Sequence, residues 1–329
     1  MKQKIKLIAE FCQNHNGSFD LVQRMLDAAA SAGATHVKLQ NIYTKNVVRR
    51  EQFEHGSICE NGEVFAIKRP FQDEYNRLKG LELTQEENRT FIEMANARGL
   101  IPMTTCFVRG DIKMLSELGY SEIKVASYDC ASFPMLRELS ERFSHVYVST
   151  GASFDDEVKF AAKVLGEKAD AYSFLHCVTL YPTPLDQLHL SRLEWLSSLS
   201  KQVGFSDHSH VESTGLIATK AAVCLGATII ERHFTVLPEA ETKDGPVSIS
   251  GDDLAEIKRF YGLETEAQES ELDVLMPNWR AVVYGEVARR LSPEELLNRD
   301  YYRGRFATPR FDGSNKASEM IFNWEETPI

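Results

Sequence analysis

The chain alternates eight times between a short run rich in β-branched and apolar residues and a stretch with the apolar spacing of an amphipathic helix. This alternation is typical of a parallel sheet whose strands are joined by crossover helices. The predicted strands are Lys6–Phe11, His36–Gln40, Ile101–Phe107, Glu122–Ser127, His145–Thr150, Tyr172–Val178, Gln202–His208 and Thr228–Thr235. The predicted helices include Leu21–Ala32, Gln85–Arg98, Pro134–Arg142, Glu157–Leu165 and Ser213–Cys224.

Eight such units match the repeat number of a closed (β/α)8 TIM barrel, whereas an open doubly wound sheet usually contains fewer strands. We therefore predict an α/β fold with a barrel domain over residues 1–265 and a short C-terminal extension over residues 266–329. The longest connection, Asn41–Leu83, follows the second strand and mixes basic with aromatic residues. Long loops that leave the carboxyl ends of barrel strands usually cover the active site.

Three local sequence features predict the structure near the end of the chain. A last barrel helix is expected near Gly251–Tyr261, and the acidic stretch Glu264–Glu271 is interpreted as a linker. Further on, Ser292 precedes a proline and two glutamates, which is the pattern of a helix start.

The composition excludes several classes of partner. The formal net charge of −11 offers no basic stripe for nucleic acid or for an anionic membrane surface, so positive charge for an anionic substrate must be local. The six cysteines stand singly, as in reduced proteins. The amino terminus, Met1–Ile5, runs directly into a strand, and no apolar run approaches the ~20 residues that span a bilayer. We expect a cytoplasmic protein.

Polar residues gather at the carboxyl ends of the predicted strands, where barrel enzymes hold their active sites. Because side chains alternate along a strand, Lys38 shares a face with Gln40, as Ser206 does with His208 and Glu231 with His233. The other polar strand ends are Glu10, Thr104, Thr105, Lys124, Ser127, Ser149, Thr150, His176 and Thr179.

Two lysines beside a ring of hydroxyl groups suit a phosphate and a carboxylate, since a buried ammonium group needs an anionic partner. Salt bridges from Lys38 and Lys124 to Glu10 or Glu231 are the structural alternative. His208 and His233 end neighbouring strands, so their imidazoles can reach one divalent cation. Hydrogen-bonded structural histidines are the alternative there.

Several ordered strings resemble the N-acetylneuraminate (sialic acid) synthase family across residues 5–260. They are Ile8-Ala9-Glu10 with Asn14-His15-Asn16-Gly17, Val37-Lys38-Leu39-Gln40, Ile123-Lys124-Val125-Ala126-Ser127, Ser149-Thr150-Gly151, Leu175-His176-Cys177, Tyr181-Pro182-Thr183-Pro184, Gly204-Phe205-Ser206-Asp207-His208 and Glu231-Arg232-His233-Phe234-Thr235. The resemblance implies a homodimeric synthase that condenses phosphoenolpyruvate with an N-acetylmannosamine-like or related aldose and releases phosphate by C–O cleavage.

The resemblance also implies roles for individual residues. A divalent metal, Mn²⁺ with Mg²⁺ or Co²⁺ as alternatives, would bind to His208 and His233. Glu10 would act as a base or stabilise cationic charge, with Lys38, Lys124 and Asp129 as further catalytic residues, and Tyr181 would face the sugar beside Asp129. The residues implied for the phosphoenolpyruvate site are Lys38, Gln40, Thr105, Lys124, Ser127, Ser149 and Ser206.

The departures from the family pattern concern the acceptor. Thr179 stands where many members carry Asn, Cys106 replaces a proline, and Asp244 is the nearest substitute for an acid that usually follows a Gly-Pro after strand eight. The family's antifreeze-like domain is not recognisable in residues 266–329. The motif Tyr301-Tyr302-Arg303-Gly304-Arg305 is either a shortened replacement for it or a packed cap with solvated arginines. A paralogue that makes another nonulosonic or related keto-sugar acid fits these departures.

Two rival functions remain open at the sequence level. One is a metal-dependent barrel hydrolase, which would use His208 and His233 but would have little use for two lysines and a ring of hydroxyls. The other is a catalytically silent barrel that binds a sugar phosphate.

Overall fold

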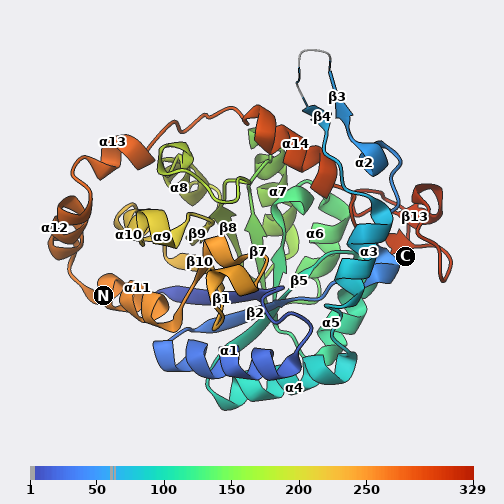
Figure 1. Cartoon of the computed structure of the whole chain (residues 1–329), viewed down its shortest axis with the longest axis horizontal. Coiled ribbons are helices and arrows are strands. Elements are labelled where there is room, and N and C mark those ends of the chain that lie inside the picture. Colours follow the sequence, from blue (N-terminus) through green and yellow to red (C-terminus); the bar gives the residue numbers. More distant parts are fainter. Residues whose placement is uncertain (1–3, 60–61, 63) are drawn as a thin grey trace.

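A computed structural model describes residues 4–59, 62 and 64–329, so Met1–Gln3 of the predicted amino-terminal segment lie outside the described residues. Eight parallel strands form a closed barrel, because the last strand pairs back onto the first (Figure 1). The predicted TIM barrel is thus confirmed. The barrel strands are β1 (Lys6–Cys12), β2 (His36–Gln40), β5 (Ile101–Cys106), β6 (Glu122–Val125), β7 (His145–Ser149), β8 (Tyr172–His176), β9 (Val203–Asp207) and β10 (Ile229–Phe234).

Helices surround the strands and bury the apolar outer face of the barrel (Figure 1). The helices within the barrel domain are α1 (Phe19–Ala32), α4 (Gln85–Ala97), α5 (Ile112–Leu118), α6 (Phe133–Ser140), α7 (Asp155–Lys168), α8 (Arg192–Ser197), α9 (Val211–Thr214), α10 (Ile217–Cys224) and α11 (Gly251–Gly262). The single helix predicted over Ser213–Cys224 is interrupted, since Gly215 has a φ of 57° and separates α9 from α10.

Inside the barrel, the alternation of side chains stacks three layers. The lowest is a polar network in which the Tyr147 hydroxyl donates to Glu122 over 2.5 Å and His36 lies 3.3 Å from the same carboxylate. Above it is an apolar layer made of Ile8, Met103, Tyr147, Leu175 and Ile229. The upper layer contains the polar strand ends. The apolar layer therefore separates a structural polar network from the upper polar layer.

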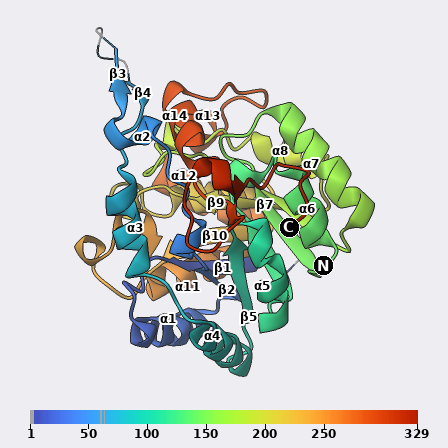
Figure 2. The same cartoon turned by 90° about the vertical axis from the view of Figure 1, so that its right-hand side faces the viewer.

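The long loop after β2 contains α2 (Gln52–His55), the antiparallel pair β3 (Ser57–Ile58) and β4 (Val64–Ala66), and α3 (Phe71–Lys79). Both views show β3 and β4 projecting beside α14 (Pro293–Tyr302), above the strands (Figures 1 and 2). Loop and tail therefore lie together at one end of the barrel.

The predicted linker is wrong, because residues 265–275 form a helix, α12 (Thr265–Leu275), that packs on α10. Leu272 is fully buried, and the Gln268 side chain donates to the carbonyl of Phe260 over 2.9 Å. The remaining tail elements are α13 (Trp279–Val283), α14, and the antiparallel pair β12 (Thr308–Pro309) and β13 (Met320–Ile321).

The predicted helix start at Ser292 is confirmed, with the Ser292 side chain accepting from the Glu295 backbone N–H in a capping box. None of the helices in the described part of the chain is both long and apolar enough to cross a membrane.

The apolar layer leaves no room at Gly204 on β9. A Cβ added there would lie 2.7 Å from the Cβ of Ile229 and 2.9 Å from the Cγ of Leu175. We predict that Gly204→Ala lowers the free energy of unfolding by about 1–3 kcal/mol, the usual cost of overpacking a core. Chemical denaturation measures this change. The control is Gly262→Ala at the end of α11, where nothing lies within 4 Å, and equal stability of the two variants would contradict the prediction.

Candidate active site

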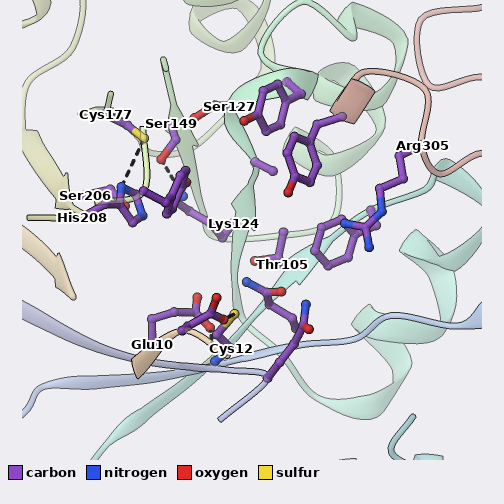
Figure 3. Close-up of a pocket in the computed structure, with 18 of the residues that line it drawn as sticks. Glu10, Cys12, Thr105, Lys124, Ser127, Ser149, Cys177, Ser206, His208 and Arg305 are labelled. Carbon is purple, nitrogen blue, oxygen red and sulfur yellow. Dashed lines mark hydrogen bonds between the residues drawn. The ribbon is translucent and has the colours of Figure 1, made fainter. Parts of the chain in front are cut away.

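A cavity of about 450 Å³ opens at the carboxyl ends of the barrel strands, a size suited to small-molecule ligands. Its wall brings together the predicted site residues from all around the barrel, and Figure 3 shows part of this arrangement. Those residues are Glu10, Lys38, Gln40, Thr105, Lys124, Ser127, Asp129, Ser149, Tyr181, Ser206, His208, His233 and Asp244. Thr179 is the exception, since it is buried and does not line the cavity.

Lys38 lies inside the barrel between two carboxylates. It forms ion pairs with Glu10 and, over 3.4 Å, with Glu231, and it donates to the Thr105 hydroxyl over 3.1 Å. Burial alone would lower the pKa of Lys38, but the two carboxylates reverse this effect and hold the pKa above its ordinary value. Lys38 is therefore a fixed positive charge.

Lys124 is less well compensated. Its ammonium donates to Ser149 over 2.7 Å and lies 3.3 Å from a Glu231 oxygen. Burial lowers its pKa, Glu231 opposes this effect, and the positive charge of Lys38 adds to it. The salt bridges considered as a structural alternative are therefore present, yet both lysines also line the cavity. Of the two, Lys124 has more to gain from an additional anion.

In the sequence motifs on β9 and β10, alternate side chains face opposite sides of the sheet. Ser206 and Glu231 point inward and are hydrogen-bonded over 2.7 Å, whereas Asp207 and Arg232 point outward and form a fully buried ion pair over 2.6 Å. This outer pair ties the two strands together beneath the helices. The inner residues are thereby held in position at the cavity wall.

His208 and His233 meet at the wall, with ring centroids 5.2 Å apart. Burial and the neighbouring His233 lower the pKa of His208 well below its ordinary value, so its ring is neutral and can offer a lone pair. The Nδ1 atom of His233 is buried and has no hydrogen-bond partner among the described residues. These two imidazoles fit the requirements of a divalent metal ion.

The predicted sugar-facing residues lie near the entrance. The Asp129 carboxylate accepts hydrogen bonds from Ser132 over 2.8 Å and from Asn323 of the tail over 3.0 Å, and burial raises its pKa. Tyr181 is half-exposed and packs against His208, with ring centroids 4.2 Å apart.

The C-terminal tail completes the wall, and sequence reasoning missed most of this contribution. The tail combines features of the two alternatives, because it packs on the barrel and also lines the cavity. Arg305 is only 7% exposed, so the expectation of solvated arginines is wrong for this residue. Figure 3 shows Arg305 across the cavity from His208. Burial, followed by the charges of Arg50 and Arg69, lowers its pKa to about 9.

Other lining residues were also missed in the sequence. Arg69 and Arg77 belong to the long loop whose basic character was noted, and Cys12 stands two residues after Glu10, a spacing that already places both side chains on one face. The remaining missed residues on the wall include Gln13, Tyr128, Cys177, Lys243, Asn298 and Tyr302.

Helix α14 is attached to the barrel by polar contacts. Arg299 forms a bidentate pair with Glu157 of α7, with separations of 2.5 and 3.0 Å, and Arg303 lies 3.2 Å from the same carboxylate. Asn298 donates to the backbone carbonyl of Thr179 over 2.8 Å. Glu157 is thus the main electrostatic anchor of the tail.

Comparison with known proteins shows which proteins this chain resembles. A family model described as the NeuB family matches residues 25–269. An N,N'-diacetyllegionaminic acid synthase of Campylobacter jejuni is 30% identical over 258 residues, covering 77% of this chain and 74% of the relative. A pseudaminic acid synthase of the same species is 27% identical over 278 residues, covering 83% and 77%. The crystal structure of a sialic acid synthetase from Leptospira borgpetersenii, in complex with citrate, aligns with a TM-score of 0.66 and 26% identity, covering 90% of this chain and 91% of the other.

Removing the negative charge of Glu157 should weaken the attachment of the tail to the barrel. We predict that Glu157→Gln weakens the docking of α14 by about 1–3 kcal/mol, because Arg299 and Arg303 lose a partly buried partner. Limited proteolysis should then cut residues 285–329 roughly tenfold faster or more, since cleavage follows the open population. Asp156→Asn on the same helix is the control, because Asp156 is 96% exposed. Equal cleavage rates in both variants would show that the tail is held by other contacts.

Proposed function

This chain belongs to the NeuB family, and from that premise we propose that it condenses phosphoenolpyruvate with an aldose to give a nonulosonic or related keto-sugar acid and phosphate. The observation that carries the proposal is the pair of buried lysines on the cavity wall, of which Lys124 lacks full compensation. A small ester that bears both phosphate and carboxylate matches two ammonium groups surrounded by hydroxyl donors. The hydroxyls assigned to it are those of Thr105, Ser127, Ser149 and Ser206, together with the Gln40 amide.

The reaction needs one new carbon–carbon bond and one broken carbon–oxygen bond. The C3 carbon of phosphoenolpyruvate attacks the aldehyde carbon, and the aldehyde oxygen becomes a hydroxyl group. Water then adds to the cationic C2, and the tetrahedral intermediate collapses with loss of phosphate to leave a keto group. Lys38 and Lys124 hold the anionic groups in place through both stages.

Glu10 is assigned the proton transfer. Its carboxylate lies on the cavity wall, paired with Lys38, and one of its oxygens accepts the Cys12 backbone N–H over 2.6 Å. A carboxylate fixed in this way can accept the proton of the attacking water, and its negative charge also favours the cationic C2. Asp129 and Tyr181 are assigned to the sugar, close to the tail.

The metal is assigned to His208 and His233, with Mn²⁺ as the expected ion. When bound, a divalent ion supplies a Lewis acid for the aldehyde oxygen. The protein's contribution is to keep the His208 imidazole neutral and oriented, through its burial and its packing against Tyr181.

A second cationic region specifies the acceptor class. Arg69, Arg77, Lys243 and Arg305 line the same cavity, and the pKa of Lys243 is lowered by burial and then by the charges of Arg77 and Arg69. Neighbouring arginines thus disfavour the charged forms of Lys243 and Arg305, and an anion beside them would relieve this repulsion, although Glu74 already pairs with Arg77 and Arg305. An acceptor that carries a phosphate or carboxylate group fits better than a neutral sugar.

We predict phosphate release when the protein is incubated with phosphoenolpyruvate, Mn²⁺ and at least one aldose from a panel of amino and neutral sugars. The panel contains each sugar both free and as its 6-phosphate, and the phosphorylated form should give the higher kcat/KM. Colorimetric detection of phosphate and mass spectrometry of the keto acid provide the readouts. Tight binding of phosphoenolpyruvate with no turnover on any aldose would favour the silent barrel, and phosphate release without an aldose would favour a hydrolase.

Lys124→Ala tests the assignment of the phosphoenolpyruvate site. Loss of a buried cationic partner should cost about 3 kcal/mol or more, which corresponds to an affinity lower by a factor of roughly 100 or more. Metal affinity should stay nearly unchanged, because Lys124 pairs with Ser149 and Glu231 and with neither histidine. Calorimetry with phosphoenolpyruvate and spin resonance with Mn²⁺ separate the two affinities, and Lys201→Ala on the exposed surface is the control. Equal loss of both affinities would show that this division of the site is wrong.

A further inference from the structure

Three potential metal ligands meet at the cavity wall, and they include His233. One of the three is a thiol. The Cys12 sulfur, a His233 ring nitrogen and an Asp244 carboxylate oxygen all lie within 4.8 Å of one another. They come from the end of β1, the end of β10 and the loop before the 3₁₀ turn Gly245–Val247. The corresponding group outside the cavity, His210, Glu212 and Glu239, is largely exposed.

The His233 ring supplies an independent sign of a missing partner. Its Nδ1 atom is buried without a hydrogen bond to any described residue, and a buried polar atom without a partner is unfavourable. This atom lies 3.8 Å from the Oδ2 atom of Asp244. Two ligands about 2.0–2.3 Å from one tetrahedral ion lie roughly 3.5 Å apart, so the separation suits a shared cation.

Cys12 is held in an unusual backbone conformation that directs its side chain into this group. Its φ is 47°, in the left-handed region that favours glycine, and the register between β1 and β2 shifts between Glu10 and Cys12. The Sγ atom lies 2.8 Å from the Oδ2 atom of Asp244. Strained backbone at a cavity wall occurs often at functional sites.

We propose that Cys12, His233 and Asp244 bind the resident divalent cation, so that a thiolate belongs to its coordination sphere with His208 beside it. The inference rests on the proposed function for the presence of a metal and refines its ligand set. A thiolate is a soft ligand, so the site should bind Co²⁺ and Zn²⁺ more tightly than Mg²⁺ or Mn²⁺. The cation would also replace the close sulfur–carboxylate contact with two metal–ligand bonds.

Co²⁺ alone, added to the purified full-length protein, reports directly on a thiolate ligand. Thiolate coordination produces a charge-transfer absorption in the near ultraviolet, which imidazole and carboxylate ligands do not give. The wild-type protein should show this band with one Co²⁺ bound per chain. In Cys12→Ser the band should vanish and Co²⁺ should bind at least tenfold more weakly.

Cys177→Ser is the matched control. Cys177 is also buried on the cavity wall, and its sulfur lies 3.8 Å from the Nδ1 atom of His208. The band should persist in this variant. Asp244→Asn should keep the band but weaken Co²⁺ binding, which tests the carboxylate even if Cys12→Ser fails to fold.

Three results would overturn the inference. They are a band that survives in Cys12→Ser, a band that depends on Cys177 instead, and the absence of a band or of bound Co²⁺ in the wild-type protein. The measurement uses neither phosphoenolpyruvate nor sugar. If the wild-type protein releases phosphate from phosphoenolpyruvate but shows no band, the thiolate ligand is therefore ruled out and the proposed function stands.

Discussion

The pairing of β1 with β10 closes the barrel, and the whole site depends on its register. In that register Glu10 lies opposite His233, and on the other edge of β1 Glu10 lies opposite Lys38. Because side chains alternate along every strand, a slip of one residue would turn these groups toward the helices and bring apolar residues into the cavity. The outward ion pair of Asp207 with Arg232 opposes such a slip between β9 and β10. Hydrogen bonding between strands thus determines where the charges lie.

The charges of the upper layer explain why further cations belong to this site. Among the described residues, Lys38 and Lys124 form ion pairs only with Glu10 and Glu231, so the buried group carries little net charge without a ligand, although Lys124 has to share Glu231 with Lys38. A multiply charged ester added to a neutral group would leave uncompensated negative charge in a buried cavity. A divalent cation on one side and the arginines of the loop and tail on the other would provide the missing positive charge. Such a balance would also allow a negatively charged protein to bind an anion, because the compensation is local.

Periodicity made the barrel and most of its site predictable, because strand ends and alternating faces are local properties of the sequence. The features that could not be predicted depend on packing between residues that are far apart in the sequence. The stretch Glu264–Glu271 is acidic enough for a linker, yet α12 forms there because Leu272 finds an apolar surface on the barrel. Arg305 is buried because residues far away in the sequence surround it, among them Glu74 of the long loop. Cys12 shares a face with Glu10, but the closeness of Asp244 depends on how a distant loop folds back.

The tail closes the cavity with a different kind of contact from those that hold the barrel. Large apolar clusters hold the helices to the strands, whereas the tail combines two small apolar clusters, around Phe306 and Met320, with ion pairs and hydrogen bonds from Arg299, Asn298 and Asn323. Such contacts are exchanged for contacts with water at little net cost, while exposing an apolar core costs about 25 cal/mol for each Å². The polar contacts of the tail therefore contribute less to the stability of the cavity wall than the apolar core of the barrel does. The lysines and histidines stand on strands whose register is set within the barrel, independently of the tail.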